Sequence, residues 1–354
     1  MIFLTDWQNN IVTNEIDLRS DTVTRPTPGM MAAIMNAKVG DDVFDEDPTV
    51  KELETKAARM FNMEAGLFCP SGTMTNQVSI RTLTQPQQEV ICDKGAHIYY
   101  YEGGGIGSNA GLSVRLVDGD RGRMKAEQIV ENINPDSIHQ PFTSLVSIEN
   151  TCNKGGGSYY TLKEMAEISA ISRKHQLKIH LDGARIFNAL IKTGDKASEL
   201  GSLFDTISIC LSKGLGAPVG SLILSSKENI QKAKRIRKSF GGGMRQSGFL
   251  AAAGIYALDN HIDRLKDDHM RAEVLGKTIA SLHYVDELMP VETNIIVFRL
   301  SDSVPVSEFL NYLSKNHIKA VQFGKQTIRM VTHLDYTDSM LDRTIETIKQ
   351  FQAG

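Results

Sequence analysis

Short apolar runs recur along roughly the first 250 residues and alternate with longer amphipathic segments. The runs are rich in β-branched side chains and are bounded by polar or glycine-containing turns, which is the pattern of buried strands. Segments between them, such as 162–175, place apolar residues at helical spacing. The predicted strands are Gly66–Cys69, Glu89–Cys92, Ser113–Val117, Ser144–Ile148, Lys178–Leu181, Thr206–Cys210 and Ser221–Leu224. This alternation predicts an α/β fold with a seven-stranded, mostly parallel sheet flanked by helices.

The pattern changes after Gly248. The remaining residues predict helices at 249–265 and 271–282, a strand at 293–299, a helix at 306–316, a strand at 327–332 and a helix at about 339–351. We therefore expect a large domain at 1–248 and a small α+β domain at 249–354. A length of 354 residues agrees with two domains of ~150 residues each.

Composition and charge exclude several classes of protein. Hydrophobic residues make up 41% of the chain, which excludes intrinsic disorder. A net charge of -3 argues against a nucleic-acid-binding protein, whose surface would be basic. No uncharged apolar run approaches the ~18 residues that cross a bilayer, so no membrane association is expected. The first residues lack the pattern of a signal peptide, and we expect a cytoplasmic protein.

The four cysteines are Cys69, Cys92, Cys152 and Cys210. They are scattered and form no C-x-x-C pair, so neither a disulfide framework nor a metal site is expected. Most of them lie in apolar stretches, where they are typical of core thiols in a reducing compartment.

Three predicted strands are followed by residues that suit one cofactor. Lys213 and Asp182 each directly follow a strand, at the end where α/β folds bind ligands. Gly72 and Thr73 open a helix after another strand, and the free N–H groups of a helix N-terminus favour a phosphate. Pyridoxal phosphate has a phosphate, a basic ring nitrogen and an aldehyde that reacts with lysine. The three positions together therefore predict this cofactor.

Each position also has an ordinary structural explanation. Lys213 suits an exposed turn, Asp182 suits the N-cap of a helix at 185–192, and Ser71 suits a cap before Gly72. Independent caps do not explain the three together. A further pattern, Gly105–Ala110, matches a dinucleotide-binding motif, but no convincing strand precedes it and that function is disfavoured.

These motifs together resemble those of the low-specificity L-threonine aldolases, in the β-eliminating lyase group of fold-type I pyridoxal-phosphate enzymes. The resemblance extends from about Ile16 to the C-terminus. The matching blocks are Asp17–Thr24, Gly40–Val43, Ser71–Met74, His180–Arg185, Leu211–Leu215 and Gly241–Gln246. The resemblance implies a fold-type I PLP-dependent transferase-like fold and pyridoxal 5'-phosphate as the cofactor.

The resemblance also implies roles for individual residues at the cofactor. Lys213 matches the Schiff-base lysine, Asp182 the partner of the pyridine nitrogen, and His97 the histidine that stacks on the ring. Arg245 is expected near a cofactor phosphate, either that of its own chain or that of a neighbouring subunit. The full set of expected cofactor contacts is Gly72, Thr73, His97, Asp182, Arg185, Ser212, Lys213 and Arg245.

Further residues match the family's substrate-binding positions. Ser20, Arg185 and Arg329 match the groups that hold the substrate carboxylate, which arginine can bind through two hydrogen bonds. Because Arg329 belongs to the small domain, the active site is expected between the domains. Tyr101 and Phe44 are expected to line the substrate side-chain pocket.

Two positions depart from the family. Phe44 stands where many members have a tyrosine, so a hydroxyl near the substrate is lost. Cys152 replaces a common histidine in the Asn-Thr-His sequence. The expected consequence is a change in side-chain contacts and specificity, whereas the lysine and aspartate positions are intact.

The implied reaction is retro-aldol cleavage of L-threonine or L-allo-threonine to glycine and acetaldehyde. The base that accepts the hydroxyl proton is His97, His139 or a water molecule, since histidine titrates near neutral pH.

The alternative functions are another fold-type I β-eliminating lyase acting on a Cβ-substituted amino acid, and a non-catalytic protein that kept the fold. The expected partners are an amino-acid substrate and further copies of the chain, as a dimer or tetramer, with no metal.

Overall fold

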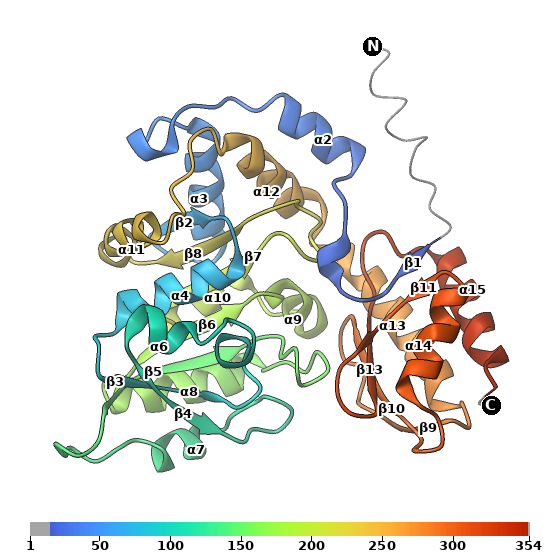
Figure 1. The fold of residues 1–354 in the computed structure, drawn as a ribbon. Coiled ribbons are helices and arrows are strands. Elements are labelled where there is room, and N and C mark those ends of the chain that lie inside the picture. Colours follow the sequence, from blue (N-terminus) through green and yellow to red (C-terminus); the bar gives the residue numbers. More distant parts are fainter. Residues whose placement is uncertain (1–14, 353–354) are drawn as a thin grey trace. The chain divides into compact units, whose positions relative to one another are not determined.

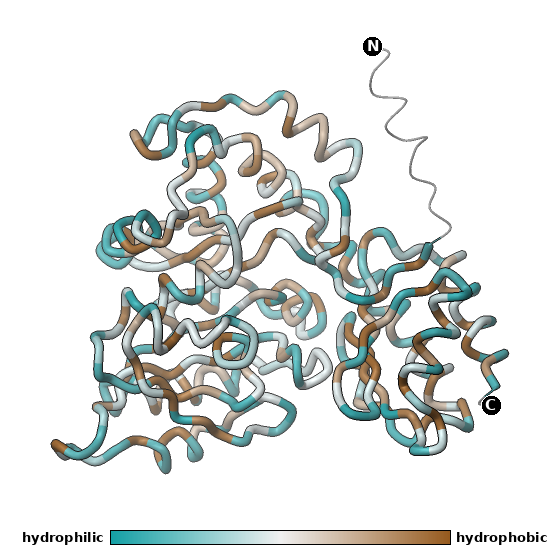
Figure 2. Tube along the Cα trace, viewed as in Figure 1, coloured by the Kyte–Doolittle hydropathy of each residue, from teal (hydrophilic) through white to brown (hydrophobic). Residues whose placement is uncertain are grey.

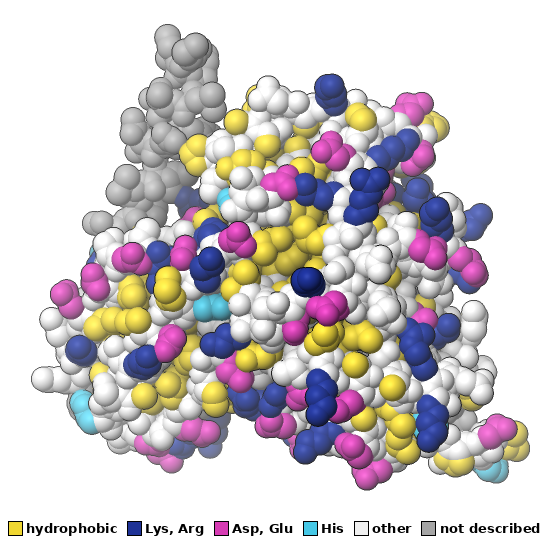
Figure 3. Space-filling view, turned by 180° about the vertical axis from the view of Figure 1, so that it is seen from behind, with side chains coloured by type: hydrophobic (Ala, Val, Ile, Leu, Met, Phe, Trp, Pro, Cys, Tyr) yellow, Lys and Arg dark blue, Asp and Glu magenta, His cyan; other side chains and the backbone are white. Residues whose placement is uncertain are grey.

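The computed structural model describes residues 15–352, which form two compact units (Figure 1). The larger unit comprises Thr24–Asp267, and the smaller comprises the described residues up to Val23 together with those from Asp268. Within the described residues, no helix combines the length and apolarity needed to cross a membrane. Figure 3 shows charged side chains of both signs spread over one face of the molecule among smaller hydrophobic areas.

The larger unit is built on one seven-stranded sheet. Its strands are β2 (Ala65–Cys69), β3 (Gln88–Asp93), β4 (Ser113–Val117), β5 (Phe142–Glu149), β6 (Lys178–Gly183), β7 (Thr206–Cys210) and β8 (Ser221–Ser225), in the order β2-β8-β7-β6-β5-β3-β4. The pairs among β7, β6, β5, β3 and β4 are parallel, and β8 runs antiparallel to both neighbours. All seven strands predicted from the sequence are therefore present, and the predicted α/β class is confirmed.

Helices cover both faces of this sheet, because successive strand residues point to opposite sides. Phe68 packs in the core that includes α3, α8 and α12, whereas its neighbours Leu67 and Cys69 pack against α4 and α11 on the other face. Hydrophobic colour follows the central strands in Figure 2. The helices of this unit are α2 (Pro28–Met35), α3 (Pro48–Met60), α4 (Gly72–Leu83), α5 (His97–Tyr100), α6 (Gly105–Ala110), α7 (Ala126–Glu131), α8 (Leu162–Lys174), α9 (Ile186–Thr193), α10 (Ala197–Leu200), α11 (Lys227–Ser239) and α12 (Gly248–Asn260).

The smaller unit combines an antiparallel sheet with three helices. Its four-stranded sheet has the order β12 (Val321–Gln322), β13 (Thr327–Val331), β10 (Ile295–Leu300) and β9 (Val285–Leu288). The helices are α13 (Leu265–Ala280), whose first residues precede the unit boundary, α14 (Val306–Lys315) and α15 (Asp338–Gln350). Aromatic rings fill the core, with the Tyr284 and Phe351 centroids 5.0 Å apart and those of Phe309 and Phe351 5.2 Å apart. The predicted small α+β unit is thus observed.

The N-terminal described segment is part of this smaller unit. Strand β1 (Ile16–Asp17) pairs in parallel with β11 (Ile318–Lys319). The backbone N–H of Val331 donates to the Leu18 carbonyl at 2.9 Å, and His333 Nε2 lies 2.6 Å from the Asp17 carbonyl oxygen. These contacts join residues near the start of the described chain to strands more than 300 positions later.

The compact units differ from the predicted division at residue 248. Helix α12 packs against α2 and α3 and therefore belongs to the larger unit. The helix predicted at 249–265 ends at Asn260, and the next begins at Leu265 rather than at Arg271. At the break, the buried His261 ring places Nδ1 2.7 Å from the Leu215 carbonyl oxygen, a contact with the segment around Lys213 that local periodicity does not indicate.

Candidate active site

The candidate site lies at the carboxyl edge of the parallel strands in the larger unit. His97 follows β3, Glu149 is the last residue of β5, Asp182 is the last but one residue of β6, and Lys213 follows β7. Glu149 and Asp182 are direct partners in the strand register. Parallel strands end at one edge of a sheet, which is where α/β folds place their ligands. The strand topology thus places Lys213 and Asp182, which the motifs singled out, and His97, which the resemblance implied, at the same edge of the sheet.

Asp182 is a buried carboxylate held by neutral donors. Its Oδ2 accepts a hydrogen bond from Asn76 Nδ2 at 2.8 Å, and its Oδ1 accepts from the Ala184 N–H at 3.1 Å. Helix α9 begins at Ile186 with Arg185 at its N-cap position, so Asp182 is not the helix cap that was the alternative interpretation. A buried carboxylate without a cationic partner is costly, and it suits a protonated ring nitrogen brought by a ligand.

Asn76 connects Asp182 to a second buried carboxylate, Glu102. Asn76 Nδ2 donates to Glu102 Oε1 at 2.8 Å as well as to Asp182, and Asn76 Oδ1 lies 3.1 Å from His180 Nε2. Burial lowers the pKa of His180 to about 4, so this histidine is neutral at pH 7. Because the NH₂ group of Asn76 faces two carboxylate oxygens, its amide oxygen faces His180 Nε2, which therefore donates its N–H. Both amide groups of Asn76 are therefore used, and its orientation is determined.

His97 is held through its backbone and its ring. Its N–H donates to Glu149 Oε2 at 2.7 Å, its Nδ1 lies 2.9 Å from Glu102 Oε1, and the Tyr101 ring is 5.4 Å away between centroids. Burial lowers the pKa of His97, but the hydrogen bond to Glu102 and the charges of Asp182, Glu102 and Glu149 outweigh burial, so the pKa is raised. Burial, with the nearby Asp182 charge, raises the pKa of Glu149 to about 7.

The N-terminus of α4 supplies the expected anion-binding geometry. Ser71 caps the helix by accepting from the Met74 N–H at 3.2 Å, which leaves the first N–H groups, those of Gly72 and Thr73, without intrahelical partners. A Cβ atom on Gly72 would lie 3.6 Å from the buried Ser221 Oγ. That hydroxyl has no hydrogen-bond partner among residues 15–352. Ser71 therefore is a helix cap, which was the alternative interpretation of this motif. The same turn still offers N–H donors to a phosphate.

Lys213 is half-buried in the loop after β7. Its carbonyl oxygen accepts from Thr24 Oγ1 at 2.9 Å and from the Gly216 N–H at 2.8 Å. Its Nζ forms no hydrogen bond or ion pair within the described part of the chain. The neighbouring Ser212 Oγ lies 3.5 Å from the Cys210 thiol. The main chain is thus fixed while the amine stays available for a ligand.

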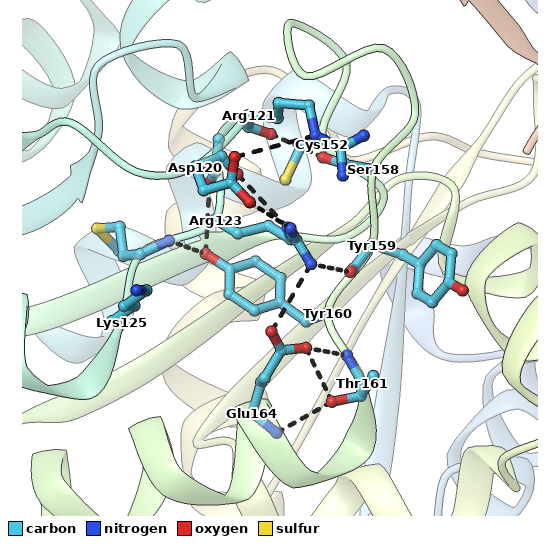
Figure 4. A network of polar contacts seen from close by, with 12 residues as sticks. Asp120, Arg121, Arg123, Lys125, Cys152, Ser158, Tyr159, Tyr160, Thr161 and Glu164 are labelled. Carbon is cyan, nitrogen blue, oxygen red and sulfur yellow. Dashed lines mark hydrogen bonds and ion pairs between the residues drawn. The ribbon is translucent and has the colours of Figure 1, made fainter. Parts of the chain in front are cut away.

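The loop after β5 is anchored on the side away from His97. Arg123 contacts Asp120, the Tyr159 carbonyl at 3.4 Å and Glu164 at 3.7 Å, and the Tyr160 hydroxyl accepts from a backbone N–H at 2.6 Å (Figure 4). These contacts hold the segment in which Asn153 donates its N–H to Glu149. Rigid support of this kind fixes the groups that face a ligand.

Cys152 occupies the same loop and is a structural thiol. Its Sγ donates to the Glu149 carbonyl at 3.1 Å, and burial raises its pKa well above the usual range. The thiol is therefore protonated and unreactive at neutral pH. The position at which the resemblance implies a histidine is thus occupied by a small buried group.

Arg245 and Phe44 contact each other at the surface. Arg245 Nη1 donates to Asp41 Oδ2 at 3.0 Å, and its guanidinium lies 6.0 Å from the Phe44 ring. Both side chains are exposed. The glycine loop before Arg245 reaches α4, because a Cβ on Gly242 would overlap the Met74 sulfur. The structure places Arg245 near the helix that offers phosphate donors, but its present partner is Asp41.

Ser20 and Arg329 are neighbours within the smaller unit. Arg329 Nη2 donates to the Arg19 carbonyl at 2.9 Å, and its guanidinium lies over the Phe323 ring at 4.9 Å. Ser20 Oγ accepts from Thr22 Oγ1 at 2.9 Å. Two of the three predicted carboxylate-binding residues are thus brought together here, and the third, Arg185, is buried beside Asp182 in the larger unit.

His139 lies away from the other candidate residues of its own chain. It is exposed and precedes β5, whereas His97 and Glu149 lie at the carboxyl edge. The eight residues of β5 separate the two edges by about 25 Å. Within one chain, His139 therefore does not reach the site that contains His97.

The sequence interpretation missed Asn76, Glu102 and Glu149. Asn76 lies in the helix that follows the predicted phosphate turn, and Glu102 follows His97 by five positions. A polar residue that is buried among apolar neighbours often belongs to a functional site. The local sequence pattern did not show that these three residues are buried, so this signal could not be used. Their role depends on hydrogen bonds between segments far apart in sequence.

Gly183 is expected to be required for close packing at this edge. A Cβ atom here would lie 2.6 Å from the Ser208 carbonyl oxygen on β7. Gly183→Ala should therefore lower the free energy of unfolding by about 1–3 kcal/mol, measured by denaturant titration. Gly107→Ala is the control, because its Cβ would have 4.0 Å to the nearest atom and the residue lies in a helix. Equal stability of both variants would contradict the packing argument.

Comparison with known proteins agrees with this geometry. The profile of the β-eliminating lyase family matches residues 17–303. The chain belongs to the β-eliminating lyase family. It is 38% identical over 347 residues to low-specificity L-threonine aldolase 1 of Arabidopsis thaliana, covering 96% of this chain and 97% of that protein. It is also 38% identical over 327 residues to the low specificity L-threonine aldolase of Escherichia coli K12, covering 92% and 96%.

Solved structures support the same fold for this β-eliminating lyase family member. A Leishmania major threonine aldolase superposes with a TM-score of 0.82 at 20% identity, covering 95% of this chain and 99% of that one. A Sphingomonas wittichii serine palmitoyltransferase superposes with a TM-score of 0.74 at 15% identity, covering 95% and 86%. The predicted resemblance and the predicted fold-type I architecture are therefore confirmed.

Proposed function

We propose that this protein cleaves L-threonine and L-allo-threonine to glycine and acetaldehyde with pyridoxal 5'-phosphate as its cofactor. The observation that supports this best is the carboxyl edge of the parallel strands, where an unpaired lysine amine, a buried carboxylate and an open helix N-terminus occur together. Family membership and the two aldolase relatives agree with the proposal.

The residues at this edge fit the cofactor chemically. The first N–H groups of α4 and the buried Ser221 hydroxyl are donors for a phosphate. Asp182 accepts two hydrogen bonds from neutral donors, and its carboxylate is a suitable partner for a protonated ring nitrogen. Lys213 offers an amine without an ionic partner in residues 15–352. Bound pyridoxal phosphate would supply an electron sink for the electrons of the broken Cα–Cβ bond.

The chain's own residues would bind the substrate and move its proton. Arg185 is proposed to bind the substrate carboxylate. Ser20 and Arg329 are proposed as further carboxylate donors because the resemblance implies this role. His97 is the proposed acceptor for the β-hydroxyl proton, because its ring Nε2 forms no hydrogen bond within the described residues and its side chain is partly exposed. Tyr101 and Phe44 are proposed contacts of the substrate side chain.

The decisive experiment is incubation of the purified protein, supplied with pyridoxal phosphate, with L-threonine and L-allo-threonine. Glycine and acetaldehyde are expected in equal amounts. The second candidate is a β-eliminating lyase, which the family name favours. It predicts pyruvate or another α-keto acid from an amino acid with a leaving group at Cβ. Elimination products without aldehyde from either threonine isomer would overturn the aldolase proposal.

We further propose a cytoplasmic homo-oligomer, either a dimer or a tetramer. The proposal rests on the family resemblance. Light scattering of the purified chain would distinguish a monomer of 39.1 kDa from multiples of that mass.

A further inference from the structure

Glu102 is a buried carboxylate that accepts three hydrogen bonds. Its Oε1 receives Asn76 Nδ2 at 2.8 Å and lies 2.9 Å from His97 Nδ1, and its Oε2 receives Gln77 Nε2 at 2.6 Å. The Glu102 side chain is fully buried, whereas 30% of the His97 side chain is exposed. Donors therefore hold both oxygens of this carboxylate in place.

These contacts determine which nitrogen of His97 holds the proton. Asn76 must direct its amide hydrogens to Glu102 and Asp182, because its oxygen accepts from the neutral His180. Glu102 is therefore an acceptor at Oε1, and a neutral His97 must donate its Nδ1–H to this atom. Nε2 is then an acceptor. It has no hydrogen-bond partner among residues 15–352, so it is free to meet a substrate hydroxyl.

Charged groups from three elements act on His97. Glu102 follows α5, Glu149 ends β5 and Asp182 lies on β6, and all three are carboxyl groups, while the Tyr101 ring packs beside the imidazole. The imidazolium formed when Nε2 takes a proton is therefore stabilised by its surroundings. Among the three, Glu102 contacts the ring itself, whereas Glu149 contacts the backbone N–H.

We propose that Glu102 is a positioning residue that fixes His97 as the Nδ1–H tautomer, so that His97 Nε2 accepts the β-hydroxyl proton of the substrate. This inference rests on the proposed function and deepens it. The O–H bond breaks as the Nε2–H bond forms, the Cα–Cβ bond breaks to release the aldehyde, and the proton passes to Cα of the product glycine. The reaction is balanced in protons, because the hydroxyl proton of the substrate ends on Cα of glycine and His97 returns to its neutral form.

The test uses Glu102→Gln, which keeps the shape and removes the charge. The amide of Gln77 can turn to accept from the new side chain. The partly buried Asn109, whose Nδ2 donates to Gln77 Oε1 at 3.3 Å, must then turn its amide as well, and with both turned the fold is expected to persist. In the cofactor-free protein, the His97 pKa measured by NMR should fall, with the resonance assigned by its loss in His97→Gln. In the loaded enzyme, kcat should fall by about 10- to 100-fold, the acidic limb of the kcat/KM profile should move to lower pH, and KM should change little.

Glu89→Gln is the matched control. Glu89 is a buried carboxylate on β3 that accepts hydrogen bonds from Asn134 and Thr143 at the other end of the strand. It should leave the His97 titration and the pH profile unchanged. An unaltered His97 pKa and profile in a folded Glu102→Gln protein would overturn the proposal.

A second measurement does not depend on the variant. Nitrogen-15 NMR of the unmodified, cofactor-free protein above the His97 pKa should show the Nδ1–H tautomer, and an Nε2–H tautomer would overturn the proposal. If instead the unmodified enzyme produces no aldehyde while the tautomer and titration are as expected, the proposed function fails and the arrangement of Glu102 and His97 stands.

Discussion

Replacing Lys213 with alanine is expected to abolish turnover while leaving the protein folded. The amine has no ionic partner in the described residues, and the contacts of this residue with Thr24 and Gly216 use its carbonyl oxygen, which alanine keeps. We expect kcat for glycine formation to fall by on the order of 10³-fold or more, because the group that would react with the cofactor aldehyde is removed. The visible absorption spectrum of added pyridoxal phosphate should also differ between the Lys213→Ala variant and the unmodified protein, because the variant has no amine at this position to react with the aldehyde.

Lys178→Ala is the control for this experiment. Lys178 begins β6 at the opposite edge of the sheet and forms an exposed ion pair with Asp205 at 3.4 Å. Exposed pairs contribute little to stability, so this variant should keep both activity and thermal midpoint. Residual activity of Lys213→Ala within tenfold of the unmodified enzyme would show that another residue reacts with the cofactor.

Asp182→Asn is expected to reduce both activity and stability. The new amide can accept from the Ala184 N–H through its oxygen, but its NH₂ group would then face the NH₂ group of Asn76. Asn76 cannot turn without losing its bonds to His180 and Glu102, so an unsatisfied donor remains, at a cost of about 1–3 kcal/mol. Loss of the charge that would hold the ring proton should lower kcat by on the order of 10²-fold or more.

Denaturant unfolding and steady-state kinetics measure the two effects separately. Asp205→Asn is the matched control, because Asp205 accepts from the Ile179 N–H at 2.8 Å at the opposite edge of the same strands. It should lose stability without a comparable loss of kcat. If Asp182→Asn and Asp205→Asn lose kcat equally, the effect of Asp182 is structural and its proposed role in cofactor chemistry is wrong.

The central strands of the sheet were predictable because they are buried on both faces. Residues such as Val90 and Ile91 on β3 point to opposite sides and are both fully buried, so a strand of this kind is an apolar run in the sequence, whereas the edge strand β4 is largely exposed. Strand order and the antiparallel direction of β8 were not predictable from these runs. The short pair of β1 and β11 also has no local signal, since its partners are about 300 residues apart.

Part of the candidate site was predictable for a related reason. Lys213 and Gly72 lie just after strands and Asp182 lies near the end of one, so correct strand positions placed them at one edge. The placement of Asn76 and Glu102 could not be predicted, because it depends on hydrogen bonds that join a helix, a loop and a strand. His139 shows the opposite case, in which a residue that matches a motif lies at the wrong edge of the sheet for its own chain.

The pairing of β1 with β11 has a consequence for how the chain is made. Residues 16–23 leave the ribosome before the larger unit, but their partners around Ile318 and Val331 are synthesised near the end. Domains generally fold as units during synthesis. Thr24–Asp267 can therefore fold while the earlier segment is still unpaired, and Ser20 joins Arg329 only after translation of the last strands. Ribosome-stalled chains ending before residue 318 should accordingly contain a protease-resistant larger unit and a cleavable segment at 16–23.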